Sequence, residues 1–204
     1  MKTWIVALVL SLISVSAAAK GTMKFNYQNA DIMDVIKDYS QASGQKFVVD
    51  PQVKGKVTAM NPESVSVEEG FNQLSMVLAS NGLAISKQGD VMMISQARRI
   101  QRNLIEVGPD LPSLKPEKMF TWVISLKFIS ADEVNKQLRI LTSTDGELVP
   151  FTQRNQLIVT DWVSNLHRIS ALIAQLDKPA RGGVTAKTAK GKMKDKEVVT
   201  DEEP

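Results

Sequence analysis

The chain contains no cysteine and only one histidine, His167, among its 204 residues. Without cysteine it has no disulfide, no thiol nucleophile and no cysteine-based metal site. His167 stands without a second histidine or an acidic neighbour at ligand spacing, whereas metal and catalytic sites need several convergent groups. We therefore predict that the chain is not an enzyme and that it uses no metal and no cofactor.

Glycine loops that cradle phosphates and fingerprints of dinucleotide binding are also missing. Three acids, Asp31, Asp34 and Asp38, share one side of a predicted helix, but no calcium-loop spacing accompanies them. We interpret them as a solvated helix face, with Asp31 as the N-cap. The formal net charge of +3 is too small to indicate a nucleic-acid-binding surface.

Only one apolar run is extended, and it lies between Trp4 and Val15. It follows a lysine and precedes small residues at Ala17 and Ala19. The run is shorter than the ~18–20 residues that a membrane-spanning helix needs. This order is typical of a secretory signal peptide over residues 1–19, so we expect export, cleavage and no membrane span after processing.

The last residues, 179–204, show no apolar periodicity and carry many charges, basic first and acidic at the end. Such a composition cannot bury enough apolar surface to offset the lost conformational entropy. We predict a disordered, charged tail. Its lysines could contact anionic lipid or nucleic acid, but a solubilising tail is the simpler interpretation for an exported chain.

The apolar spacing between residues 23 and 94 predicts a first small α+β domain. Alternation at Phe25 and Tyr27 predicts an opening strand, and spacings of three and four predict two helices, capped by Asp31 and Ser66. Glu69 lies three residues after Ser66, as in a capping box. The remaining apolar runs predict strands at residues 47–49, 57–60, 83–86 and 91–94, the last two as a hairpin.

Residues 95–118 contain Pro109, Pro112 and Pro116, which oppose helix and inner strand, so we expect a linker there. Residues 119–178 predict a second domain in the order strand–helix–strand–strand–helix. The fold class is therefore α+β, with two small mixed-sheet domains in tandem and a KH-like second domain. KH domains clamp RNA with a Gly-x-x-Gly loop, which is missing here.

Strict alternation from Phe120 to Phe128 predicts the first strand of the second domain. Ser130 with Glu133 is expected to form a second capping box, and Asp161 is expected to cap the last helix. We expect His167 on the solvent side of this helix. Inward positions are predicted at Leu166, Ile169, Ile173 and Leu176, and Trp122 and Trp162 are candidates for core or interface positions.

The run Phe-Val-Val-Asp-Pro-Gln-Val-Lys-Gly-Lys-Val-Thr at residues 47–58 resembles the first periplasmic domain of type II secretion secretins. Residues 81–85 and 89–94 extend this resemblance. Residues 124–133 and 155–161 resemble the next periplasmic domain of the same family. A full secretin continues into a pore-forming domain, which we do not find, so the resemblance implies either one half of a split secretin or an accessory component that docks on a secretin ring.

The resemblance implies protein partners: secretin ring subunits, an inner-membrane platform protein and possible secreted substrate, with ring or homo-oligomer formation in the periplasm at an outer-membrane secretin complex. We predict no nucleic-acid partner. The candidate partner edge is the first strand, Lys24, Phe25, Asn26 and Tyr27; ordinary pairing within the domain is the alternative. An alternative function is a periplasmic signalling domain that relays to an inner-membrane regulator.

Overall fold

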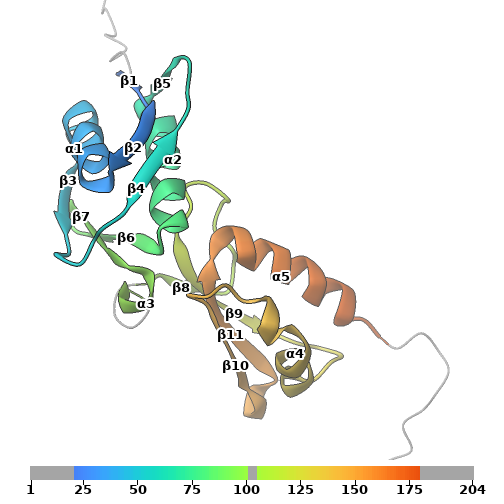
Figure 1. Ribbon diagram of the computed structural model, residues 1–204. Helices are drawn as coiled ribbons and strands as arrows, with labels where there is room; N and C mark the ends of the chain where they lie inside the picture. Colours follow the sequence, from blue (N-terminus) through green and yellow to red (C-terminus); the bar gives the residue numbers. More distant parts are fainter. Residues whose placement is uncertain (1–20, 101–104, 180–204) are drawn as a thin grey trace, which may run out of the picture.

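The computed structural model describes residues 21–100 and 105–179, which form two successive α+β domains (Figure 1). The predicted fold class is confirmed. The predicted signal peptide, with Ala17 and Ala19, and residues 180–204 of the predicted tail lie outside the described residues. The first domain comprises β1 (Thr22–Lys24), β2 (Tyr27–Asp31), α1 (Ile32–Ser43), β3 (Lys46–Val49), β4 (Lys56–Ala59), β5 (Ser64–Ser66), α2 (Val67–Ser80), β6 (Leu83–Gln88), β7 (Val91–Gln96) and α3 (Ala97–Ile100).

Strands of the first domain form one three-stranded sheet and two strand pairs. The sheet has the order β3-β7-β6, with β3 parallel and β6 antiparallel to β7. The pairs are β1-β5 and β2-β4, both antiparallel. Helices and strands share one core, whose fully buried members include Phe25, Ile32, Val35, Leu74, Leu78 and Ile94.

Both helices of this domain begin at the predicted caps. The Asp31 carboxylate accepts a hydrogen bond from the Met33 amide at 3.0 Å, and the Ser66 hydroxyl accepts one from the Glu69 amide at 3.1 Å. Gly44 ends α1 with φ of 70°, a left-handed conformation that glycine adopts without a Cβ penalty. These local signals fix where the apolar stripes of α1 and α2 begin, and hence which faces they bury.

The predicted opening strand is wrong in one respect. Residues 24–27 do not form one strand, because β1 ends at Lys24 and β2 begins at Tyr27. Between them Phe25 is fully buried and packs edge-on against Tyr27, with ring centroids 5.2 Å apart. Phe25 is therefore a core residue between two short strands, and its carbonyl accepts a hydrogen bond from Asn61 Nδ2 at 2.8 Å in place of a ladder bond.

The second domain is one four-stranded sheet covered on one face by two helices (Figure 1). Its strand order is β10-β11-β9-β8, antiparallel except that β8 lies parallel to β9. The buried face joins the sheet to both helices through Trp122, Leu157, Val159, Val134 and Ile169. The elements are β8 (Val107–Gly108), β9 (Met119–Ser125), α4 (Ala131–Leu138), η1 (Arg139–Leu141), β10 (Glu147–Phe151), η2 (Thr152–Arg154), β11 (Gln156–Trp162) and α5 (Val163–Leu176).

Several local expectations for residues 95–178 need correction. The expected linker contains the end of β7, the short helix α3 and the strand β8. Because β8 is an edge strand, prolines can be tolerated close to it. Strand β9 ends at Ser125, so Phe128 falls in the following loop and is 58% exposed. Leu176, at the last turn of α5, is exposed rather than inward.

Asp161 is not the cap of α5; Trp162 holds that position and makes no side-chain capping bond. Instead Asp161 is fully buried at the end of β11. Its carboxylate accepts hydrogen bonds from the Ser143 amide at 2.9 Å and from Asn165 Nδ2 at 2.6 Å. A buried carboxylate needs such partners, and this one ties the loop before β10 to the first turn of α5.

Asp177 closes the other end of α5. Its carboxylate accepts hydrogen bonds from three successive amides, those of Lys127, Phe128 and Ile129, at 2.6 to 3.2 Å. Desolvation works to raise the pKa of Asp177, but the bonds from these amides and the charge of Lys127 outweigh it, so the pKa is lowered. The ionised carboxylate therefore stabilises the loop between β9 and α4.

Replacing Phe25 by alanine is expected to lower the free energy of unfolding by about 3–5 kcal/mol, because the ring is fully buried. Chemical denaturation followed by fluorescence measures this change. Phe128→Ala is the matched control; its side chain is 58% exposed, and we expect a change of about 0.5 kcal/mol or less. Equal effects of the two substitutions would contradict the placement of Phe25 in the core.

Asp177→Asn is expected to lower the free energy of unfolding at pH 7 by about 1–2 kcal/mol, since the partly exposed amide-binding carboxylate loses its charge. Because the folded-state pKa is lowered, this stabilisation is present above the unfolded-state value of about 3.9 and is lost as the pH falls through the lower folded-state value. Denaturation of both proteins between pH 7 and pH 2 should therefore show converging stabilities. The control Asp90→Asn, at an exposed turn position, should change the free energy of unfolding at pH 7 by about 0.5 kcal/mol or less.

Candidate functional site

A buried apolar cluster joins the two domains. It contains Ala84 of β6, Ala97 and Ile100 of α3, and Met119 and Trp162 at the adjoining ends of β9 and β11. All five are at most 8% exposed. Trp162, for which core and interface were both considered, thus lies in the contact between the domains, whereas Trp122 lies in the core of the second domain.

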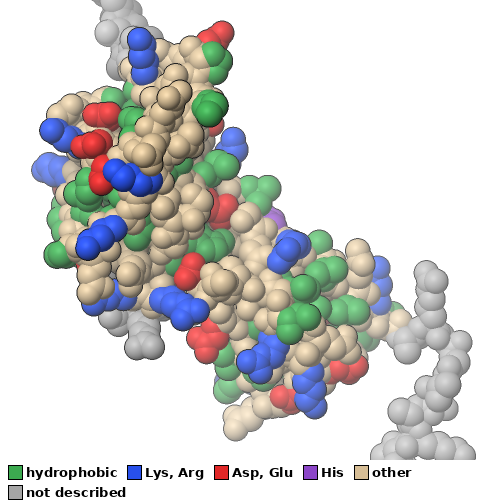
Figure 2. Space-filling view, in the orientation of Figure 1, with side chains coloured by type: hydrophobic (Ala, Val, Ile, Leu, Met, Phe, Trp, Pro, Cys, Tyr) green, Lys and Arg blue, Asp and Glu red, His purple; other side chains and the backbone are tan. Residues whose placement is uncertain are grey.

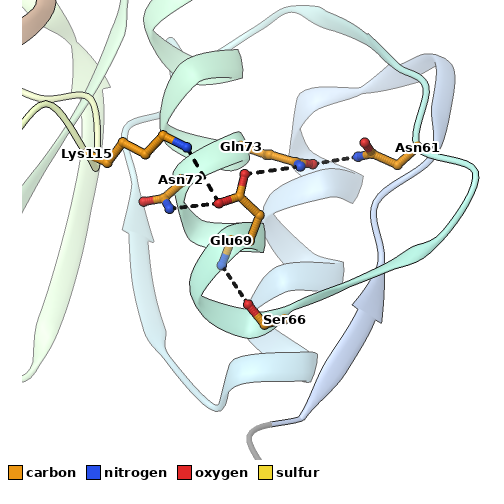
Figure 3. Close-up of polar contacts among 6 residues, drawn as sticks. All are labelled: Asn61, Ser66, Glu69, Asn72, Gln73 and Lys115. Carbon is orange, nitrogen blue, oxygen red and sulfur yellow. Dashed lines mark hydrogen bonds and ion pairs between the residues drawn. The ribbon is translucent and has the colours of Figure 1, made fainter.

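Polar contacts flank this cluster. The Arg98 Nε donates to the carbonyl of Thr144 at 3.2 Å and lies 3.7 Å from a carboxylate oxygen of Asp145. On the opposite side of the junction, Lys115 lies 3.8 Å from Glu69 of α2 (Figure 3). Each contact joins one domain to a segment of the other, so the apolar cluster is bracketed by two charged ties.

Residues 105–118, between α3 and β9, are held mainly by the second domain. The Thr121 amide donates to the carbonyl of Glu106 at 2.9 Å, and the Trp122 indole donates to that of Pro109 at 2.8 Å. His167, expected on the solvent side, is half-buried, and its Nε2 lies 2.8 Å from the carbonyl of Pro112. Pro109 and Pro112 lie outside helices and strands, so their carbonyls have no ladder partner, and the side chains of Trp122 and His167 contact them instead.

Glu69 lies at the centre of the polar contacts on α2 (Figure 3). Its carboxylate accepts from Asn72 Nδ2 at 3.1 Å and from Gln73 Nε2 at 3.4 Å, and it does not close the expected capping box back onto Ser66. The hydrogen bond from Asn72, together with Lys115 and Gln73, lowers the pKa of Glu69 against an opposing effect of desolvation. The Glu69 carboxylate thus has Asn72, Gln73 and Lys115 as its partners.

Two hollows lie between α2, the β6–β7 hairpin and the segment before β9. One encloses about 200 Å³ and is lined by residues that include Phe71, Ile85 and Ser86. The other encloses about 480 Å³ and is lined by residues that include Tyr39 and Lys115. The two share Phe71, Met92 and Pro116. Their linings are mostly apolar, with charges at the margins, which suits binding of a peptide better than proton transfer.

The candidate partner edge is divided by the structure. Lys24 and Asn26 are exposed, Phe25 is fully buried, and Tyr27 is half-buried. The pKa of Tyr27 is raised to about 12, first by desolvation and then by the negative charge of Asp38. The Tyr27 hydroxyl also donates a hydrogen bond to the Asp38 carboxylate at 3.1 Å, which raises the pKa further. Within the described residues, β1 and β2 each have a single neighbouring strand, so each keeps one unpaired edge.

The acids of α1 take local partners. Asp31 caps the helix and lies 3.7 Å from Lys56, and Asp38 accepts from Tyr27. In the described part of the chain, no three acidic or histidine side chains are placed to hold a metal ion. Lysine, arginine and acidic side chains are interspersed over the face shown in Figure 2, without a continuous basic stripe of the kind that nucleic acid requires.

Two family models match the two domains. Residues 25–94 match the N0 domain of GspD-like proteins, and residues 121–182 match the short domain of bacterial type II/III secretion systems. This chain is homologous to the N-terminal domains of secretins. The resemblance drawn from the sequence motifs is thereby confirmed, and neither matched region is a secretin pore domain.

Known secretins support this assignment. Secretin XcpQ of Pseudomonas aeruginosa is 30% identical over 153 residues, which is 75% of this chain and 22% of that protein. Secretin XpsD of Xanthomonas campestris pv. campestris is 28% identical over 166 residues, 80% of this chain and 20% of that protein. The chain thus spans about a fifth of the length of these secretins.

The outer-membrane complex of the Klebsiella pneumoniae type II secretion system, which contains PulD, PulS and the PulC HR domain, is similar in fold. The match has a TM-score of 0.67 at 19% identity and covers 76% of this chain and 27% of that one. In the part of this chain that the structure describes, no helix is long and apolar enough to cross a membrane. Secretion components with these domains are structural proteins of protein transport.

The junction cluster should couple the stabilities of the two domains. Ile100→Asp places a charge at a position that is 2% exposed, which should weaken the interdomain contact by about 3 kcal/mol or more. We expect calorimetry to show one transition for the unaltered chain and two for this variant. The control Gln96→Asp, at an exposed position near α3, should keep one transition; two transitions in the unaltered chain would contradict the coupling.

Proposed function

We propose that this chain is a periplasmic binding and assembly component of a secretin-type secretion system, of the type II or a related pilus class. It docks on a secretin ring and contacts an inner-membrane platform protein or the secreted substrate. The observation that carries this proposal is the pairing of an N0 domain with a secretin short domain in one chain. The relative from Klebsiella was solved in a complex with PulS and the PulC HR domain, which supports protein partners of this kind.

The second domain offers a surface suited to contact with secretin subunits. On the sheet face opposite α4 and α5, the cross-strand row Val149, Ile158 and Val123 is apolar. Val149 is 42% exposed and Phe151, in the same strand and on the same face, is 40% exposed. Exposed apolar groups gathered on one sheet face are characteristic of protein interaction surfaces, and a neighbouring subunit in a ring would cover them.

The first domain offers strand edges to a second partner. Among the residues that the structure describes, strands β1 and β2 each have only one neighbouring strand, and the exposed residues Lys24 and Asn26 lie at the end of β1 and between the two strands. An extended segment of a platform protein can add to such an edge through backbone hydrogen bonds. We retain Lys24, Phe25, Asn26 and Tyr27 as the proposed partner edge, with Phe25 supporting it from the core.

The absence of native cysteine makes this edge directly testable. Asn26→Cys, capped with a bulky maleimide, should weaken binding of the periplasmic part of the cognate platform protein by about tenfold or more, since the cap obstructs strand addition. Biolayer interferometry measures the affinity. Lys136→Cys with the same cap, on the exposed side of α4, should bind as the unaltered chain does.

Uncapped Asn26→Cys controls for folding and should bind normally. Equal affinity of the two capped proteins would exclude this edge as the contact while leaving the binding function intact. Failure of every form, including the unaltered chain, to bind platform protein or secretin would contradict the proposed function itself.

A further inference from the structure

The smaller of the two hollows, the junction hollow, lies between the domains and takes its lining from both. It encloses about 200 Å³, with walls from α2, β6, β7 and α3 of the first domain. Residues within the range 105–119 of the second domain close its far side, so it admits a compact molecule and not an extended strand. A cavity of ~150 Å³ already holds a benzene ring. The junction hollow therefore has room for a ring-sized molecule that contacts both domains at once.

The walls of the junction hollow are largely apolar. Phe71, Ile85 and Met92 line it from the first domain, and Ile105 and Met119 line it from the second. Binding pockets for small molecules have this kind of lining, with a small number of polar groups that orient the ligand. Such walls favour a ligand with an apolar body, because its transfer from water is favourable.

The charged residues of the lining balance one another. They are two lysines, Lys87 and Lys118, and two glutamates, Glu106 and Glu117. The Lys118 ammonium lies 2.6 Å from the Glu106 carboxylate, so these two charges neutralise each other. With no net formal charge in its lining, the junction hollow favours a neutral ligand over an ion.

Ser86 supplies a polar group that points to a ligand. It is 6% exposed, and its hydroxyl has no hydrogen-bond partner in the part of the chain that the structure describes. The other serine of the lining, Ser75, donates to the carbonyl of Phe71 at 2.8 Å. A buried hydroxyl without a partner costs free energy and is unusual in a native protein. A ligand group that bonds to Ser86 would remove this cost.

The backbone of β6 adds further polar groups beside Ser86. The β6–β7 hairpin has a two-residue loop, so its first pair, Gln88 and Val91, is hydrogen-bonded. Bonded and non-bonded pairs alternate from there along an antiparallel ladder. The amide and carbonyl groups of Ile85 and Lys87 are therefore directed away from β7, and both residues belong to the lining. A ligand group near Ser86 thus has backbone donors and acceptors close by.

We propose that the junction hollow binds a small neutral molecule with an apolar, ring-sized body and one hydrogen-bonding group. The apolar body packs between Phe71 and Met92 on one side and Met119 on the other, and the polar group bonds to the Ser86 hydroxyl. Because the walls belong to both domains, the bound molecule contacts both and stabilises the closed junction by mass action. The site is thus a small-molecule control on how firmly the two domains are held together.

Indole and indene test this proposal on the full chain. The two probes have the same bicyclic shape, but only indole has an N–H group that can donate to the Ser86 hydroxyl. Titration followed by two-dimensional amide NMR measures both affinity and place. We expect indole to bind with a Kd on the order of 0.1–1 mM, as suits a ligand of its size, and about fivefold more tightly than indene. Its binding should shift amide signals on both sides of the hollow, those of Ser86 and Met119 among them.

Two serine variants separate the hydroxyl from the rest of the site. In Ser86→Ala, indole should bind no more tightly than indene, and the free energy of unfolding without a probe should not fall, because an unsatisfied buried group is removed. Ser95→Ala is the matched control. Ser95 lies on β7 and is also 6% exposed, but it is outside the lining. This control should keep the preference for indole.

Loss of that preference in Ser86→Ala alone, with shifts at the walls of the junction hollow, supports the proposal. Equal affinity of the unaltered chain for both probes, shifts scattered over the surface, or no saturable binding would overturn it. A less stable Ser86→Ala protein together with no binding of either probe would also overturn it, since the hydroxyl would then bond to water. None of these outcomes depends on whether the proposed secretin-system function is correct.

Discussion

Trp162 and Met119 are neighbours across two antiparallel strands, and both are buried against Ala84 and Ile100 of the first domain. This apolar contact fixes one domain on the other. Because β9 begins at Met119 and α5 begins directly after Trp162, the same contact also sets the start of the main strand and the last helix of the second domain. The ties from Arg98 to Asp145 and from Lys115 to Glu69 then limit rotation about it.

A fixed pair of domains suits an assembly component better than two domains on a free tether would. The apolar sheet face around Val149 and Ile158 and the strand edges around Lys24 and Asn26 belong to different domains. With the junction closed, the distance and angle between these surfaces are set before any partner binds. Pre-organisation of this kind lowers the entropy lost on association, as is useful where one chain must contact two proteins at once.

Local signals in the sequence predicted much of this fold. Periodicity located α1, α2, α4 and α5, and the caps at Asp31, Ser66 and Ser130 were predicted correctly. Alternation did not predict that β1 would end at Lys24 and β2 begin at Tyr27, because period-two spacing reports which side chains face the core and not whether the backbone forms ladder bonds. Asp161 has the residue type of a helix cap, but its buried contacts with Ser143 and Asn165 depend on a distant loop.

Less of the candidate site could be predicted. Prolines in residues 95–118 indicated a linker, yet hydrogen bonds from Trp122 and His167 to proline carbonyls hold that segment on the second domain. Such bonds join residues far apart in the chain and leave no periodic trace. The family motifs were more informative than any single residue. They lie at turns and strands that each domain needs to fold, so they identified the two domain types, and the proposed function rests on the pairing of those domain types.

In-cell crosslinking of the tagged, unaltered chain, followed by mass spectrometry of the captured proteins, would show which envelope proteins the chain contacts. We expect recovery of a pore-forming secretin together with an inner-membrane platform protein, with crosslinks to the first domain for the platform protein and to the second domain for the secretin. A chain that stays monomeric and captures no envelope protein, or captures only an inner-membrane regulator, would contradict this expectation.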